Sequence, residues 1–194
     1  MTAEYDPDGY LRDGPGFTGE ALHAKLTQTW RDAPGLVGWI RSVDHKSIGR
    51  RYLVTALVFL ALGGILAALM RLQLSGAEQE IIGPDRYNQI FTMHGTTMMF
   101  LFAVPVMDAM AIYLIPLMLG TRNLAFPRVN AFSYWMYLAG GLLLWAAFVL
   151  NVGPDAGWFS YVPLAGPEFS PGKRVDVWAQ MVTFTEIAAL AVAV

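Results

Sequence analysis

The sequence predicts an all-α fold, a polytopic bundle of transmembrane helices. Hydrophobic residues make up 55% of the chain and charged residues only 14%, unlike the composition of a soluble domain. The apolar residues gather into long runs, and about 20 of them in a helix cross ~30 Å of hydrocarbon. The chain contains no cysteine, so any redox centre must be held by His, Met, Tyr or carboxylate side chains.

Four apolar runs define the expected helices, at about residues 52–72, 87–119, 131–152 and 176–194. The first three are long enough to span a bilayer. The fourth still runs at Val194 without interfacial aromatic residues, basic residues or a cap, so we expect a truncated helix and an N-terminal piece of a longer protein. We therefore divide the chain into a polar N-terminal extension, residues 1–40, and a transmembrane part, residues 41–194.

Basic residues predict the orientation of these helices. Four of them lie within about ten residues of the start of the first run, and two lie between the second and third runs: Arg41, Lys46, Arg50, Arg51, Arg122 and Arg128. Residues 75–84, between the first and second runs, contain two glutamates and no Lys or Arg. The positive-inside rule then places the N-terminus in the cytoplasm, although Lys173 and Arg174 in the third loop weaken the bias.

His94 is the most informative residue of the sequence. It lies seven residues into an uncharged apolar run, Tyr87 to Met107, where a titratable side chain is costly unless something binds it. Neutral imidazole is the commonest metal ligand and a usual axial donor to haem iron. Arg71 and His94, which lies ~10 Å below Tyr87, both fall in the outer third of the bilayer, where an arginine can reach a haem substituent. Two other interpretations stay open: Arg71 extends to lipid headgroups, and His94 bonds a neighbouring helix.

Three further stretches resemble subunit I of the haem–copper oxidases. They are Asp44–Gly49, Leu117–Asn130 with the following Phe132–Trp135, and Gly157–Gly166. Their order and spacing are similar to those of the family from about residue 42 to residue 180. The resemblance implies that the four helices belong to a larger bundle of about twelve.

The resemblance also implies a role for five residues. His94 matches the first axial ligand of a low-spin haem, of the haem a type, and Arg71 matches the arginine that bonds its formyl group. Trp158 and Tyr161 match residues near the outward edge of that haem, and Tyr87 an aromatic residue at the mouth of the second helix. The second axial ligand and the ligands of the high-spin haem and copper lie on later helices in the family. We therefore expect no catalytic residue in this sequence.

The departures from the family pattern concern protons and a cation. Asn123 stands where many members have an aspartate at the mouth of a proton channel, and Ile112 replaces a family asparagine. Asn130 is retained, but Ala131 follows it in place of a second asparagine. Because an amide carries no charge and an aliphatic side chain holds no water, this route is doubtful. Gln73 replaces a glutamate that helps to bind a structural cation, which puts that metal site in doubt too.

Two intramembrane carboxylates need an explanation, and the second, Glu186, matches no family carboxylate. Asp108 lies fourteen residues after His94, about 21 Å further along the helix and within ~40° of the same face, near the cytoplasmic interface. It is either a proton entry point or a solvated or arginine-paired residue. Glu186 lies about ten residues into the fourth run and serves either a helix–helix hydrogen bond or a proton relay.

By resemblance, the intact protein is the catalytic subunit of a proton-translocating respiratory oxidase, which passes electrons from cytochrome c through a low-spin haem to O2. The expected partners are oxidase subunits II and III, cytochrome c and membrane lipid, with no nucleic acid. The expected location is the plasma membrane of a bacterium. Two alternatives remain open: a quinol oxidase or another branch of the superfamily, and a non-redox transporter in which His94, Asp108 and Glu186 carry protons.

Overall fold

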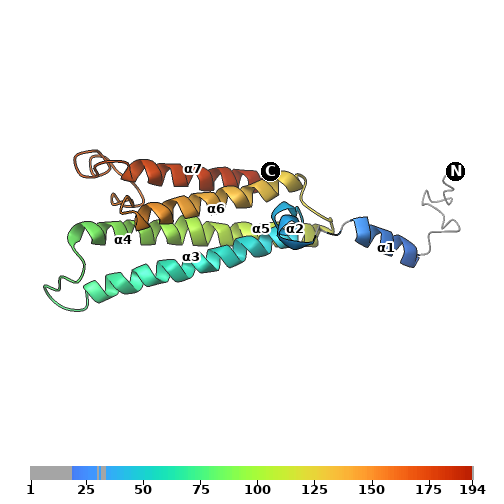
Figure 1. Ribbon diagram of the computed structural model, residues 1–194, viewed down its shortest axis with the longest axis horizontal. Coiled ribbons are helices and arrows are strands. Elements are labelled where there is room, and N and C mark those ends of the chain that lie inside the picture. The colour runs from blue at the N-terminus through green and yellow to red at the C-terminus, as the bar shows by residue number, and fades with distance from the viewer. Residues whose placement is uncertain (1–18, 30, 32–33, 194) are drawn as a thin grey trace. The chain divides into compact units, whose positions relative to one another are not determined.

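The computed structural model describes residues 19–29, 31 and 34–193 and divides the chain into two units, Met1–Ser42 and Val43–Val194. Of the predicted extension, residues 1–18, 30, 32 and 33 lie outside the described residues. The first unit contains two short helices, α1 (Gly19–Thr29) and α2 (Gly35–Arg41). The second contains six helical segments (Figure 1): α3 (His45–Gln73), α4 (Pro84–Thr96), the π-helix η1 (Thr97–Ala103), α5 (Val104–Leu119), α6 (Pro127–Val149) and α7 (Arg174–Ala193).

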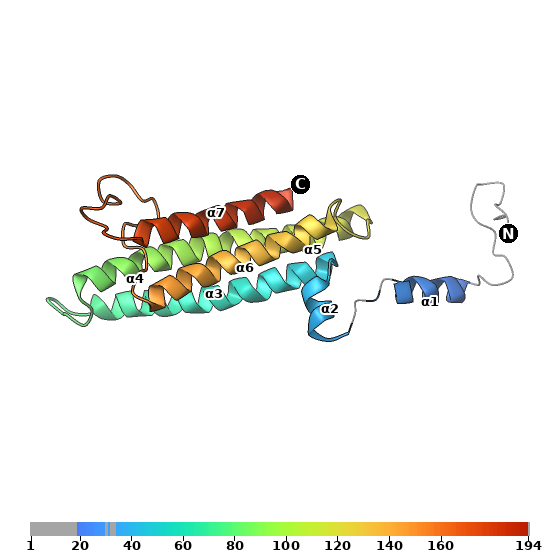
Figure 2. The same ribbon diagram turned by 45° about the horizontal axis from the view of Figure 1, so that its top comes forward.

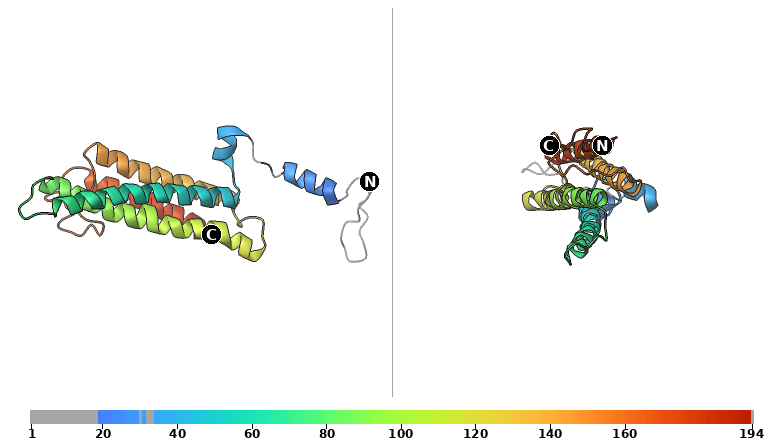
Figure 3. Two further views of the ribbon diagram at one scale, coloured as in Figure 1. Left: turned by 90° about the horizontal axis from the view of Figure 1, so that it is seen from below. Right: turned by 90° about the vertical axis from the view of Figure 1, so that its left-hand side faces the viewer.

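The second unit confirms the predicted fold class. The described residues form helices and no strand. Four helices are long and apolar enough to cross a membrane: His45–Gln73, Pro84–Leu119, Pro127–Val149 and Arg174–Ala193. They lie side by side and run alternately up and down, as Figures 1 and 2 show, and Figure 3 views this bundle end-on.

Three of the helices begin several residues before the apolar runs that predicted them. A capping side chain marks the start of α3, and a proline in the first turn marks the starts of α4 and α6. The side chain of Asp44 accepts a hydrogen bond of 3.0 Å from the Ser47 backbone N–H and so caps α3. Pro84 and Pro127 occupy the first turns of α4 and α6, where a missing N–H costs nothing. The first turns of these helices are therefore polar.

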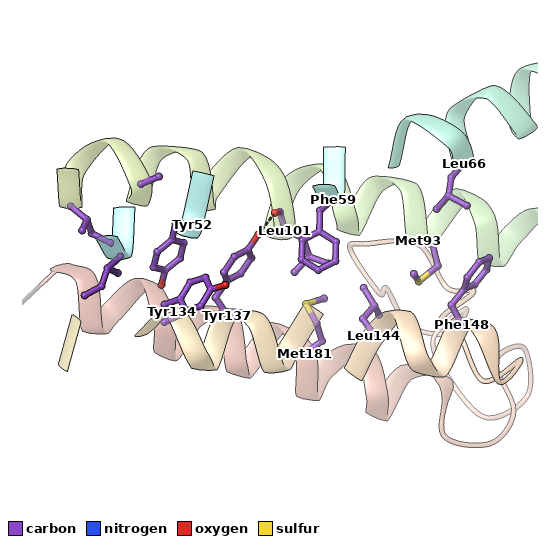
Figure 4. Packing of buried hydrophobic residues seen from close by; sticks show 14 of the residues in the cluster. Tyr52, Phe59, Leu66, Met93, Leu101, Tyr134, Tyr137, Leu144, Phe148 and Met181 are labelled. Atoms are coloured by element: carbon purple, nitrogen blue, oxygen red, sulfur yellow. Dashed lines mark hydrogen bonds between the residues drawn. The ribbon is translucent and has the colours of Figure 1, made fainter. Parts of the chain in front are cut away.

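The core of the bundle contains a group of stacked aromatic rings (Figure 4). The rings of Tyr52 on α3 and Tyr137 on α6 stack with centroids 5.1 Å apart, and Tyr134 meets the Tyr52 ring edge-on at 5.5 Å. The Tyr137 hydroxyl donates a 2.7 Å hydrogen bond to the backbone carbonyl of Leu101, which lies within η1. A side chain of α6 thus satisfies a backbone group where the second spanning helix departs from α-helical geometry.

Glycine allows a close approach between α6 and α7. A Cβ on Gly140 would lie 2.9 Å from the Cβ of Phe184 and 3.3 Å from the carbonyl oxygen of Met181. Real Cβ atoms do not approach other atoms so closely, so any larger residue at this position must separate the two helices.

We expect Gly140→Leu to destabilise the protein by ~1–3 kcal/mol, because overpacking a close helix contact forces the backbones apart. The midpoint of denaturation by sodium dodecyl sulfate measures this effect. Ala139→Leu is the matched control, since Ala139 is exposed on the same helix and its replacement should leave the midpoint unchanged. Equal midpoints for the two variants would contradict the α6–α7 contact.

Candidate functional site

His94 is fixed by a hydrogen bond between two helices. It lies on α4, half-buried, and its Nδ1 is 2.9 Å from the backbone carbonyl oxygen of Gly63 on α3. A carbonyl oxygen only accepts, so Nδ1 carries the hydrogen and Nε2 of the neutral ring keeps its lone pair. Metal-binding histidines usually have this arrangement, because the bond to the second nitrogen fixes the tautomer and the ring orientation.

Gly63 permits this approach because it has no side chain. A Cβ there would lie 2.8 Å from the Met98 sulfur and 3.5 Å from Cγ2 of Thr97. The neighbouring Gly64 is exposed, and nothing lies within 4 Å of the position where its Cβ would be. Of the two glycines, Gly63 therefore faces α4, and Gly64 leaves its backbone open.

The loop after α6 places Trp158 against the turn that carries His94. The Gly157 backbone N–H donates a 2.9 Å hydrogen bond to Oγ1 of Thr92, a buried residue two positions before His94. The Trp158 ring then packs over Gly95, 3.5 Å from the position of a Cβ there, and meets the Phe100 ring edge-on at 6.1 Å. Sequence reasoning missed Thr92, because its partner lies 65 residues away and no local pattern marks the pair.

The other predicted haem residues lie farther from His94. Arg71 is exposed in the last turn of α3, eight residues after Gly63 and so ~12 Å farther along the axis. Tyr161 is 72% exposed and stacks on Phe159 with centroids 5.8 Å apart. Tyr87 is half-buried and lines a cavity of about 370 Å³ where α3 ends and α4 begins.

Gln73 organises the loop between α3 and α4. Its Oε1 accepts a 2.7 Å hydrogen bond from the Ile82 backbone N–H, and its Nε2 donates to the Gln79 carbonyl. The amide therefore uses both a donor and an acceptor to hold the loop. A carboxylate at this position could not donate the second bond, so the glutamine has a structural role here.

At the opposite end of the bundle, Asn130 is buried, and its side-chain amide has no hydrogen-bond partner among the described residues. Neither its side-chain nitrogen nor its side-chain oxygen has a hydrogen-bond partner among the described residues, although the residue is only 2% exposed. Its backbone carbonyl accepts a 2.6 Å bond from the Ser133 hydroxyl, which in turn accepts a 2.9 Å bond from the Tyr52 hydroxyl. Buried amides need partners, so this polar chain has the chemistry of a water-binding site.

Asn123 and Ile112 both make structural contacts at the same end of the bundle as Asn130. The Asn123 Nδ2 donates a 2.9 Å bond to the Val43 carbonyl, and its Oδ1 accepts from the Leu124 N–H at 3.0 Å. Ile112 is fully buried, and its carbonyl lies 3.2 Å from Nδ1 of His45. Sequence reasoning did not assign His45 this contact, because its position before the first apolar run suggested a loop.

Asp108 and Glu186, which the sequence analysis treated separately, line one small cavity between α5, α6 and α7. Its volume is about 30 Å³, and Tyr137 and Thr185 also contribute to its wall. The angle that placed Asp108 near the face of His94 assumed an unbroken α-helix. Because η1 lies between the two residues and changes the register, that angle does not apply.

Among the described residues, no group of three or more His, Asp or Glu side chains could hold a metal ion. The described residues therefore offer no set of His, Asp and Glu side chains that would complete the coordination of a metal at His94. A haem does not need such a set, because its ring supplies the equatorial ligands and the protein only axial ones. The donor set around His94 thus fits a haem.

Comparison with known proteins gives one family. A family model described as "Cytochrome C and Quinol oxidase polypeptide I" matches residues 47–194. A cytochrome c oxidase subunit 1 of Synechocystis is 49% identical over 63% of this chain and 22% of its own length. One of Alkalihalophilus pseudofirmus is 41% identical over 72% of this chain and 22% of its own length.

A haem–copper oxidase subunit I+III of Aeropyrum pernix is 44% identical over 73% of this chain and 17% of its own length. The chain spans about a quarter of the length of the curated relatives it matches first. The matched residues include all four membrane-crossing helices, with the α3–α4 contact at His94 and the loop that carries Trp158. The chain belongs to the family of subunit I polypeptides of the haem–copper oxidases.

Proposed function

We propose that an intact subunit with this sequence is the catalytic subunit of a respiratory oxidase, which takes electrons from cytochrome c, reduces O2 and translocates protons. Family membership supports an oxidase, and relatives named cytochrome c oxidase subunit 1 favour cytochrome c over quinol as the donor. A quinol oxidase is the nearest alternative, because the matched family includes both. Family membership favours an oxidase over a non-redox transporter.

In this proposal His94 is the axial ligand of a low-spin haem through its Nε2. The observation that carries the assignment is the hydrogen bond from Nδ1 to the Gly63 carbonyl, which fixes the tautomer that donates through Nε2. When bound, the haem supplies one-electron redox chemistry. The Gly63 carbonyl makes the imidazole more electron-rich through this bond and holds the ring plane in one orientation.

The remaining haem contacts are assigned by chemistry and position. Arg71 has a rigid fork of donors and is exposed at the outer end of α3, so it suits a formyl group and supports haem a. Trp158 covers the turn of His94 and excludes water from it. Tyr87 and Tyr161 lie at the outer end of the bundle, where tyrosine rings suit the membrane interface.

The proposed proton route begins at the polar chain of Asn130, Ser133 and Tyr52. The unpartnered amide of Asn130 can bind water, whereas Asn123 is held by Val43 and Leu124. Asp108 and Glu186 share a cavity with room for about two waters, at ~10–15 Å³ each. We assign them a supporting role as carboxylates that exchange protons through this cavity.

The chain is a multi-pass membrane protein by its four apolar helices and its bacterial relatives. We place it in the bacterial plasma membrane with a cytoplasmic N-terminus, as the basic residues indicate. Membrane lipid surrounds it, and oxidase subunits II and III are its proposed partners. The name of the Aeropyrum relative, subunit I+III, supports the association with subunit III.

His94→Leu in the full-length subunit should abolish the low-spin haem spectrum, because leucine has no donor atom for iron. Reduced-minus-oxidised absorption spectra of the purified protein measure the loss. His23→Leu is the control, since His23 is exposed on α1 and its replacement should leave the spectrum intact. An unchanged low-spin signal in His94→Leu would refute the assignment.

Asn123→Ala and Asn123→Asp should leave proton pumping by the reconstituted full-length enzyme almost unchanged, because this amide serves the loop. Both variants lose the hydrogen bond to Val43, at a cost to stability of ~1 kcal/mol, and the carboxylate adds repulsion from the carbonyl. Thermal unfolding measures stability, with exposed Asn88→Ala as control. Loss of pumping in Asn123→Ala with intact oxygen reduction would return Asn123 to the proton route.

The proposed topology predicts opposite readings for two reporters. A reporter fused after Arg128 should be cytoplasmic, and one inserted near Gly76 should be external, because the basic residues stay inside. Alkaline phosphatase and green fluorescent protein fusions give complementary signals for the two sides. The reverse pattern would overturn both the orientation and the depth assigned to His94.

A further inference from the structure

The short helix α2 exposes an unusual number of large apolar side chains. Leu36 is 78% exposed, Val37 59%, Ile40 47% and Trp39 46%. These four make up more than half of a helix of seven residues. A helix in water does not keep such residues on its surface, so an apolar environment outside the described protein must cover them.

The apolar residues occupy one face of α2. At about 100° per residue, Leu36, Val37, Trp39 and Ile40 fall within an arc of about 160°. The other three residues, Gly35, Gly38 and Arg41, fall on the remaining arc. Gly38 is buried, while the apolar face points outward. The helix is therefore amphipathic, although its residues belong to a stretch that composition describes as polar.

Basic residues flank this helix in the sequence. Between residues 31 and 51 the sequence has five basic residues and two acidic ones. Arg31, Arg41, Lys46 and Arg50 are exposed, and the Asp44 side chain is engaged with the Ser47 backbone N–H. An anionic surface complements this charge distribution, and an apolar layer beneath that surface complements the face of α2.

The chain keeps α2 near a membrane boundary. Three residues separate Arg41 from His45, the first residue of the membrane-crossing helix α3. A fully extended connection of that length spans at most ~14 Å, counting ~3.6 Å per residue. Whatever its orientation, α2 stays within reach of the headgroup region at the N-terminal end of α3.

We propose that α2 is an interfacial helix, bound to the anionic lipid surface of the leaflet at the N-terminal end of α3. Leu36, Val37 and Ile40 insert below the headgroups, Trp39 lies at their level, and Arg31 and Arg41 contact lipid phosphates. Interfacial helices have this combination of a broad apolar face, an aromatic residue and flanking basic residues. The inference does not depend on the identity of the bound cofactor or the electron donor.

The test uses the full-length protein in liposomes of phosphatidylglycerol and phosphatidylcholine. A bimane label is attached at Ile40→Cys, or at Leu36→Cys, and quenched by lipids brominated on their acyl chains. Residues 1–194 contain no cysteine, and labelled wild-type protein corrects for any cysteine elsewhere. We expect quenching several-fold stronger than at the control label, Gln28→Cys, on the exposed surface of α1.

The other outcomes overturn the proposal. If water-soluble iodide quenches the label at Ile40 as strongly as the label at Gln28, α2 lies in water. A label protected from both iodide and brominated lipid places the apolar face against another polypeptide. The anionic contribution is tested with Arg31→Gln and Arg41→Gln together, which should reduce lipid quenching at Ile40; unchanged quenching would remove the arginines from the proposal.

Discussion

The hydrogen bond between His94 and the Gly63 carbonyl is the interaction on which the candidate site depends. It joins α3 to α4 inside the membrane-crossing bundle and fixes the nitrogen that can donate to a metal. Residue 63 has no Cβ, and a side chain there would force the Met98 side chain, whose sulfur would lie 2.8 Å from that Cβ, to move. A backbone carbonyl is a suitable partner, because it carries no charge to desolvate.

The π-helix η1 divides the second spanning helix into two parts with different neighbours. Before it, His94 contacts α3, and Thr92 accepts a hydrogen bond from Gly157 in the loop between α6 and α7. After it, Asp108 faces α6 and α7. A wider helical turn changes the direction of every later side chain, so one helix serves two sites. At this point the Tyr137 hydroxyl donates a hydrogen bond to the Leu101 carbonyl within η1.

The sequence was sufficient to predict the four spanning helices, because the bilayer imposes helix length. The haem-ligand role of His94, inferred from the cost of burying a titratable group, stays a prediction. The sequence did not predict where α3 starts, since the Asp44 cap and a polar first turn decide that. It also missed the cavity shared by Asp108 and Glu186. That cavity depends on η1 and on contacts between distant helices, neither of which leaves a periodic pattern in the chain.

Buried polar residues in this bundle differ in whether their hydrogen bonds are complete. Asn123 donates to Val43 and accepts from Leu124, so its amide is satisfied by backbone groups. Asn130 is buried with both side-chain atoms unpartnered among the described residues, next to the hydroxyls of Ser133 and Tyr52. Burying such an amide without a partner is costly, and water removes that cost. A proton route needs ordered water, so the amide of Asn130, which has no protein partner among the described residues, is the better candidate for its entrance. The amide of Asn123, whose hydrogen bonds are made to the backbone, is the better candidate for a structural role.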